Sequence, residues 1–223
     1  MPDCITFIGW HNSGKTTLLV EIVGILKERG WNVCVVKSSS HSEVSFDTPE
    51  KDSSRFKAAG ADEVAFIAPD QVVVMKRNDN MPLRVLVHRF FPDADIVLGE
   101  GFKNANGVDK IEVTRQGEEP TLYREVSGVI AVVTDADVPG TRVFRHNEAR
   151  EIAEFIEKRY ILQDLDRPSA HLLVNGRHIP LKFFVQQAIA GAVSGLVEAL
   201  KGTQGAKTIE ILVKTPYCKE NGK

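Results

Sequence analysis

The feature that most constrains this sequence is the run Gly9–Thr16, GWHNSGKT, which fits G-x-x-x-x-G-K-[ST] at every fixed position. It follows a short apolar run and precedes a segment whose apolar residues recur at helical spacing. In such a loop the glycines bring backbone N–H groups close to phosphates, the lysine neutralises phosphate charge and the hydroxyl ligates Mg²⁺. The sequence therefore predicts a nucleotide site lined by Gly9, His11, Asn12, Ser13, Gly14, Lys15, Thr16 and Thr17.

The segments around this loop predict an α/β fold. An apolar strand before the loop, a helix after it that ends at Gly30 and a strand at Asn32–Lys37 form a β–loop–α–β unit. Such a unit implies parallel strands joined by a right-handed crossover. The later runs DIVLGEGF and GVIAVVTDADV have unbroken apolar cores, typical of strands covered by helices on both faces. We expect a doubly wound, mostly parallel sheet of the P-loop NTPase type.

Two further parts of the chain have patterns of their own. KDSSRFKAAGADEV predicts a short helix that stops near Gly60, and EVAFIA and QVVVMKR predict two strands that meet at a Pro69-Asp70 turn. A boundary near residues 164–169 separates an expected nucleotide-binding domain, 1–165, from a small α+β extension, 166–223. Within that extension Asn175-Gly176 predicts a hairpin, followed by a mostly apolar helix that ends at Gly202 and a final strand, KTIEILVK. The patterns assign no role to the extension.

The metal site needs an acidic residue at the end of a second strand. IVLGEGF supplies Glu100 where the apolar run of residues 96–98 ends, whereas Asp95 precedes that strand and should lie at its opposite end. We expect Glu100 and Thr16 to bind Mg²⁺, with the carboxylate acting through water. Lys15 and Glu100 are the two catalytic candidates.

Base recognition has a weaker signal in VVTDADV, residues 132–138. This run resembles the guanine signature [NT]-K-x-D, with Thr134 first and Asp137 last, but Asp135 replaces the lysine. An aspartate could accept both N1–H and N2–H₂ of guanine, which adenine cannot match. Either aspartate could read the base, or both could be turn residues.

Composition constrains the expected partners and cellular compartment of the protein. The chain of 223 residues has a formal net charge of −2 and a pI near 6.3, which gives no electrostatic reason to expect nucleic acid as a partner. Its three cysteines form no C-x-x-C pair, which favours a reducing compartment. The longest apolar segment, 183–200, contains polar side chains and is a poor membrane span. We expect a cytoplasmic protein that contacts neither nucleic acid nor membrane.

These motifs together resemble the molybdopterin-guanine dinucleotide biosynthesis adaptor proteins called protein B. The resemblance extends over most of the first 165 residues and is most specific in Asp52–Ala61, DSSRFKAAGA, combined with Glu100–Lys103, EGFK. It also includes GWHNSGKTTL, VVKSSSH, DKIEV and IAVVTDADVP.

The resemblance implies a P-loop fold that binds GTP with Mg²⁺, hydrolyses it weakly and forms a homodimer. It implies as partner the guanylyltransferase that converts molybdopterin cofactor to its guanine dinucleotide, and molybdopterin or that dinucleotide as a second ligand. Residues beyond the loop would then form a pterin-facing wall of the site. By the resemblance these are His41, Asp47, Lys51, Asp52 and Arg55.

The chain also departs from the family pattern. His11 stands where a serine is usual, Ser38 follows Lys37 where a histidine is usual, and Glu50 replaces a glycine. Cations nonetheless follow several strand ends, the edge where α/β sheets place ligands. Lys37, Lys51, Arg55 and Lys103 would suit a second anionic molecule beside the nucleotide phosphates.

Two other classes of protein share the phosphate loop. A small-molecule kinase should have an arginine-rich lid that closes on the phosphates, and the sequence has no compact run of that kind. A metal-delivery GTPase should have clusters of histidine and cysteine, but the six histidines are scattered. The adaptor hypothesis is therefore favoured over both.

Overall fold

The computed structural model describes residues 2–39, 52–115, 117–162, 170–206 and 208–214, with the backbone alone at 52–54. The chain divides into two compact units, Met1–Leu165 and Asp166–Lys223, and each is described by itself below. The first unit holds the phosphate loop.

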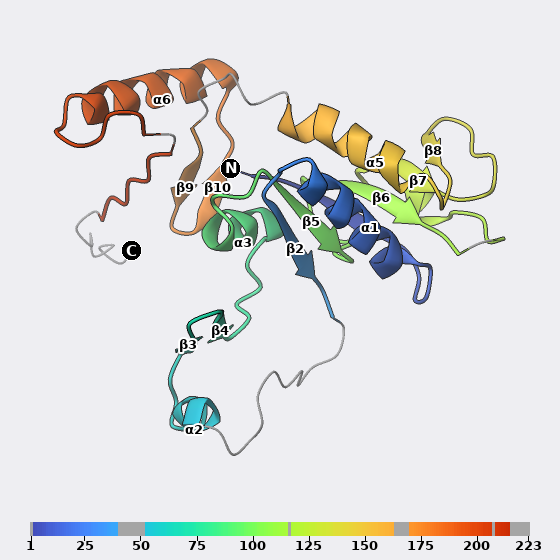
Figure 1. Ribbon diagram of the computed structural model, residues 1–223, viewed down its shortest axis with the longest axis horizontal. Helices are drawn as coiled ribbons and strands as arrows, with labels where there is room; N and C mark the ends of the chain where they lie inside the picture. The colour runs from blue at the N-terminus through green and yellow to red at the C-terminus, as the bar shows by residue number, and fades with distance from the viewer. Residues whose placement is uncertain (1, 40–51, 116, 163–169, 207, 215–223) are drawn as a thin grey trace, which may run out of the picture. The chain divides into compact units, whose positions relative to one another are not determined.

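A six-stranded, entirely parallel sheet forms the centre of the first unit (Figure 1). The strand order is β2-β5-β1-β6-β7-β8, so β1 lies between β5 and β6. The parallel sheet confirms the predicted fold class. The strands are β1 (Asp3–Ile8), β2 (Val33–Lys37), β5 (Ile96–Glu100), β6 (Asp109–Val113), β7 (Val129–Val133) and β8 (Arg142–Phe144).

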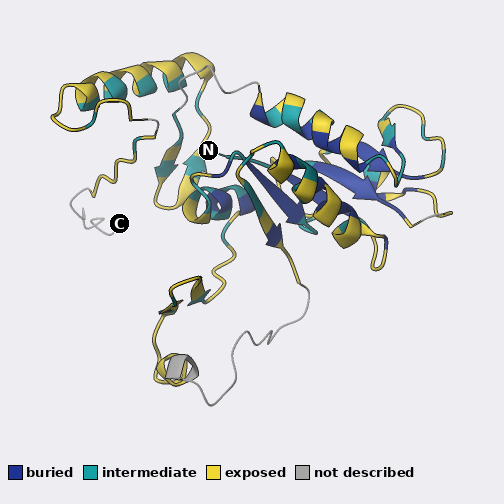
Figure 2. Ribbon diagram, in the orientation of Figure 1, coloured by how far each residue is buried: buried dark blue, intermediate teal, exposed yellow. Residues whose placement is uncertain are grey.

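Helices cover both faces of this sheet. Helices α1 (Lys15–Glu28) and α5 (Ala149–Ile156) pack on one face, and their side chains join a core that contains Phe7, Leu98 and Ile111. Helix α3 (Leu83–Phe90) packs on the other face, with Val36 and Val97. Neighbouring strand residues such as Val97 and Leu98 thus belong to different cores, which explains why the sheet is buried in Figure 2 and why its strands read as continuous apolar runs. Helix α4 (Leu122–Glu125) and the π-helix η1 (Glu157–Ile161) complete this part of the unit.

The register of the sheet determines which strand ends meet at the loop. Phe7 of β1 pairs with Glu100 of β5, and Lys37 of β2 pairs with the same Glu100 from the other side. The chain leaves β1 for the loop two residues after Phe7. Glu100 therefore lies beside the loop, at the carboxyl edge where parallel sheets place ligands.

A helix and a hairpin lie outside the central sheet. Helix α2 (Asp52–Ala58) packs against β3 (Glu63–Ile67), which pairs antiparallel with β4 (Val72–Lys76). These elements confirm the predicted helix and strand pair on either side of Gly60. Their apolar side chains are largely exposed, including Ile67, of which 75% is accessible.

The second unit contains a hairpin and a helix. Strands β9 (Leu172–Val174) and β10 (Arg177–Ile179) pair antiparallel across Asn175-Gly176, both in the left-handed region with φ of 51° and 73°. Helix α6 (Phe183–Glu198) follows and has no buried residue. The predicted final strand is wrong within residues 208–214, because these residues pair with no described strand and a strand needs such a partner for its backbone hydrogen bonds. No described helix is long and apolar enough to span a membrane.

Candidate functional site

The phosphate loop joins β1 to α1 and is tightly folded. A Cβ atom at Gly9 would lie 2.1 Å from the carbonyl oxygen of Val113 and 2.8 Å from Ser13 Oγ, so only glycine fits there. Asn12 and Gly14 have φ of 60° and 87°, the left-handed geometry that turns the chain into the helix. The loop thus has the backbone shape that its sequence predicted.

The backbone N–H groups at the start of α1 have no side-chain hydrogen-bond acceptor among the described residues. Gly14 is the N-cap, no side chain caps the helix, and its first turn has no acidic residue. The first backbone N–H groups of a helix have no partner within it, and they carry the positive end of the helix dipole. This arrangement suits a phosphate. Ser13 is buried, whereas His11, Asn12 and Thr17 are exposed at the outside of the loop and the first turn.

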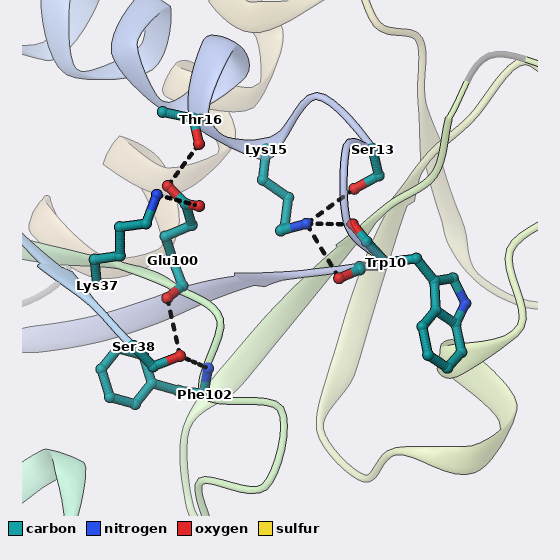
Figure 3. A network of polar contacts seen from close by, with 9 residues as sticks. Trp10, Ser13, Lys15, Thr16, Lys37, Ser38, Glu100 and Phe102 are labelled. Carbon is teal, nitrogen blue, oxygen red and sulfur yellow. Dashed lines mark hydrogen bonds and ion pairs between the residues drawn. The ribbon is translucent and has the colours of Figure 1, made fainter. Parts of the chain in front are cut away.

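Lys15 points back over the loop. Its Nζ donates to the carbonyl oxygens of Gly9 at 3.1 Å and Trp10 at 2.6 Å, and to Ser13 Oγ at 3.1 Å (Figure 3). Burial lowers the pKa of Lys15; the nearby Glu100 carboxylate acts in the opposite direction. The ammonium is therefore held at the centre of the loop, where a phosphate would meet it.

Glu100 connects the loop to the end of β2. Its Oε2 accepts a hydrogen bond from Thr16 Oγ1 at 2.9 Å, and its Oε1 lies 2.9 Å from Lys37 Nζ (Figure 3). The structure thus brings Thr16 and Glu100, the two predicted metal ligands, into direct contact. Asp95, in contrast, lies at the other end of β5, where its Oδ2 accepts from the backbone N–H of Asn32 at 2.7 Å.

Ser38 is a site residue that the sequence did not reveal. Its backbone N–H donates to the carbonyl oxygen of Glu100 at 3.0 Å, and its Oγ accepts from the N–H of Phe102 at 3.2 Å. A Cβ atom at Gly101 would lie 2.2 Å from Ser38 Oγ, so the segment after β2 and the segment after β5 approach each other closely here. Ser38 therefore fixes the backbone on both sides of Gly101. The only signal in the sequence was its place directly after Lys37.

The proposed base-reading segment is held by an arginine. The Arg145 guanidinium donates to the carbonyl oxygens of Thr134 at 3.0 Å and Ala136 at 3.1 Å and pairs with Asp137 at 3.0 Å. Thr134 is buried, and its Oγ1 accepts from the N–H of Ala136 at 3.2 Å. Asp135 and Asp137 are exposed, which leaves either one accessible to a ligand. Arg145 was not predicted as a site residue. It follows β8, and the pairing of β8 with β7 brings Arg145 to this loop.

The residues predicted to face a second ligand are only partly within the described part of the chain. Lys37 is paired with Glu100, and Lys103 Nζ lies 5.5 Å from the centroid of the Trp10 ring. Arg55 belongs to α2, which packs against β3, and its role toward a second ligand stays a prediction. Asp52 begins α2, but its side chain is outside the described part. His41, Asp47 and Lys51 also lie outside the described residues.

Comparison with known proteins identifies the family. The family described as molybdopterin guanine dinucleotide synthesis protein B matches residues 4–135. The chain belongs to this family. The molybdopterin-guanine dinucleotide biosynthesis adapter protein of Haemophilus influenzae is 34% identical over 152 residues, which are 67% of this chain and 84% of that protein. The crystal structure of a molybdopterin-guanine biosynthesis protein B superposes with a TM-score of 0.56 at 31% identity, covering 70% of this chain and 98% of that one.

The second unit is shared by one of the relatives. A protein of Methanocaldococcus jannaschii, whose name also describes an adapter of molybdopterin-guanine dinucleotide biosynthesis, is 25% identical over 237 residues. That match covers 96% of this chain and 99% of the relative, so it takes in residues of both units. The family resemblance is confirmed by the matches above, and the match with this relative extends into the second unit.

Proposed function

We propose that this protein binds GTP with Mg²⁺ and acts as an adaptor for the guanylyltransferase that makes molybdopterin guanine dinucleotide. Family membership supports the adaptor role. The observation that supports the nucleotide site is the contact of Thr16 with Glu100 at 2.9 Å, directly beside the phosphate loop.

The residues at this contact suit Mg²⁺. Magnesium binds oxygen ligands, usually one or two carboxylates or hydroxyls together with waters and substrate phosphates. Thr16 and Glu100 supply such oxygens at the start of α1, where the phosphates of a nucleotide would lie. They would hold the ion, whose positive charge would help to neutralise the phosphates. Lys37 would then give up part of its ion pair with Glu100.

The phosphates would replace the present partners of Lys15. Its three donor contacts are to oxygens of the loop itself, at Gly9, Trp10 and Ser13. A phosphate cradled by the same loop offers charged acceptors in their place, and hydrogen bonds to charged groups are the stronger ones. The lysine is therefore positioned to neutralise phosphate charge without a large movement of the backbone.

Guanine recognition is proposed for the segment after β7. Arg145 holds the backbone of Thr134 and Ala136, which fixes the direction of the two exposed aspartates. Asp137 shares its carboxylate with Arg145, whereas Asp135 forms no ion pair with the described residues. One of these carboxylates would accept the N1–H and N2–H₂ donors of guanine.

We propose that hydrolysis of GTP is slow. Arginine, which supplies much of the acceleration in phosphoryl-transfer enzymes, is absent from residues 7–17, 33–39 and 96–103 of the sequence. The cations that contact the loop or Glu100 among the described residues include the lysines Lys15, Lys37 and Lys103. A protein with this site is better suited to hold a nucleotide than to turn it over rapidly.

The exposed hairpin supports a homodimer. A two-stranded hairpin is marginally stable by itself, and strands β3 and β4 expose apolar side chains to solvent. A second copy would cover this surface. Its members, between 37% and 75% exposed, are Phe56 of the adjoining helix α2 and, on the strands, Phe66, Ile67, Val72, Val73 and Val74. We also propose a cytoplasmic location, which the free thiols of Cys4 and Cys34 support.

Nucleotide titration and co-purification test this function. GTP should bind in the presence of Mg²⁺ more tightly than ATP, and the tagged protein should retain the guanylyltransferase from a cell extract. Tighter binding of ATP would refute the guanine assignment. Rapid transfer of the γ-phosphoryl group to a small acceptor would instead identify a kinase, and release of a stoichiometric transition metal on GTP turnover would identify a metal-delivery GTPase.

A further inference from the structure

Trp10 is an exposed aromatic residue inside the phosphate loop. Its backbone carbonyl accepts a hydrogen bond from Lys15 Nζ at 2.6 Å, so its main chain is part of the phosphate cradle. Its side chain is nevertheless directed away from Lys15 and Glu100 (Figure 3), and 58% of the residue is exposed. The loop thus presents an indole ring at its outer surface, next to the place where phosphates would bind.

Lys103 stands over this ring. Its Nζ is 5.5 Å from the ring centroid, a cation–π distance. The backbone that carries Lys103 is fixed, because Gly101 donates to the carbonyl oxygen of Phe7 at 2.9 Å and Phe102 donates to Ser38 Oγ at 3.2 Å. The ammonium and the indole are therefore held near each other by two separate loops, and much of the indole is still accessible.

This pair of side chains favours one chemical class of ligand. A planar heteroaromatic ring stacks on an indole, and an ammonium group binds an anion. An aliphatic anion would use only Lys103, and an uncharged ring would use only Trp10. A flat ring that carries a phosphate group uses both at once.

We propose that Trp10 and Lys103 form a stacking site for a phosphorylated pterin-type ring, held next to the bound nucleotide. This inference rests on the proposed function, because it assigns residues to the second ligand of that site. The base of the bound nucleotide is a second planar ring that could stack on Trp10. We assign that base to residues 134–137, since they follow a different strand, β7, and the main chain of Trp10 belongs to the phosphate cradle.

The test uses the full-length protein loaded with GTP and Mg²⁺, so that the phosphate loop itself is occupied. The probe is 6-hydroxymethylpterin monophosphate, and its affinity is measured by equilibrium dialysis. Contact with the ring is measured by tryptophan fluorescence in a Trp31→Phe background, because the chain has only two tryptophans. We expect saturable binding of the probe and a matching quench of Trp10 emission.

Three variants separate stacking from charge. Trp10→Leu should weaken binding of the probe about tenfold, within the range for loss of a base stacked on an aromatic side chain, while Trp10→Phe retains most of the affinity. Lys103→Gln should weaken binding of the phosphorylated probe more than binding of the unphosphorylated pterin. Phe90→Leu is the matched control, since Phe90 is also an exposed aromatic residue but lies at the end of α3.

The outcomes distinguish this inference from the proposed function. Failure of the wild-type protein to bind GTP would overturn the proposed function. Binding of GTP without binding of the pterin phosphate would overturn this inference alone, as would a Trp10→Leu variant with wild-type affinity for the probe. Full quenching of Trp10 by GTP, with no further change on adding the probe, would show that the ring serves the nucleotide and would also overturn it.

Discussion

Glu100→Gln tests whether the carboxylate at the end of β5 serves the metal. Both of its oxygens are engaged, one by Thr16 and one by Lys37, each at 2.9 Å. Only 14% of the Glu100 side chain is exposed, but 61% of the Lys37 side chain is, so the ion pair is partly screened. Loss of this pair should therefore lower the free energy of unfolding by less than about 1 kcal/mol.

The effect on metal-dependent binding should be larger. Loss of a carboxylate that holds a metal, directly or through water, typically weakens metal affinity by about 10- to 100-fold, or roughly 1.4–2.7 kcal/mol. We expect this loss in the affinity for GTP measured with Mg²⁺ by calorimetry. In EDTA the variant should bind GTP at least as well as the wild type, because a negative charge near the phosphates has been removed.

Asp95→Asn provides the matched control for Glu100→Gln. Asp95 lies at the opposite end of the same strand and contacts the backbone of Asn32, so its loss should leave the Mg²⁺ dependence unchanged. An equal loss of GTP affinity in EDTA and in Mg²⁺ for Glu100→Gln would refute the reasoning. It would mean that Glu100 only shapes the loop through Thr16.

Three further predictions concern the loop, the base and a thiol. Gly9→Ala would place a Cβ atom 2.1 Å from the Val113 carbonyl oxygen and should abolish GTP binding in a titration, while the circular dichroism spectrum shows a folded protein. Arg145→Met should reduce the ratio of GTP to ATP affinity, because the Thr134 and Ala136 carbonyls lose their donor; an unchanged ratio would exclude this segment from base reading. Burial raises the pKa of the Cys4 thiol to about 12, so native Cys4 should react with iodoacetamide at pH 8.5 at least tenfold more slowly than in urea, with reactivity rising as pH increases toward 12.

The geometry around the phosphate loop could be predicted because it depends on local patterns and on strand register. The loop motif fixes the positions of Gly9 and Lys15, and an apolar run of defined length fixes the end of β5 at Glu100. The pairing of β5 with β1, which the structure supplies, then places Glu100 opposite Phe7. The same reasoning correctly separated Glu100 from Asp95.

The remaining contacts depend on tertiary pairings that no local pattern shows. Arg145 reaches residues 134–136 only because the short strand β8 pairs with β7. Helix α3 was not predicted, because its apolar run of residues 85–87 is short, and a run of that length does not distinguish a helix from a strand. The final strand of the extension was predicted from the run KTIEILVK, but such a run does not provide a partner for its backbone hydrogen bonds.

The position of Glu100 also links the nucleotide to the chain beyond β2. The same carboxylate contacts Thr16 on the loop and Lys37 at the end of β2, so the proposed metal would compete with Lys37 for one negative charge. Ser38, the next residue, is bonded to the backbone of Glu100 and Phe102. Since Lys37 and Ser38 are adjacent, a continuous series of contacts runs from Glu100 to the backbone next to Lys103, whose ammonium lies 5.5 Å from the Trp10 ring centroid. The phosphate loop and the proposed second-ligand site are thus joined through one acidic residue.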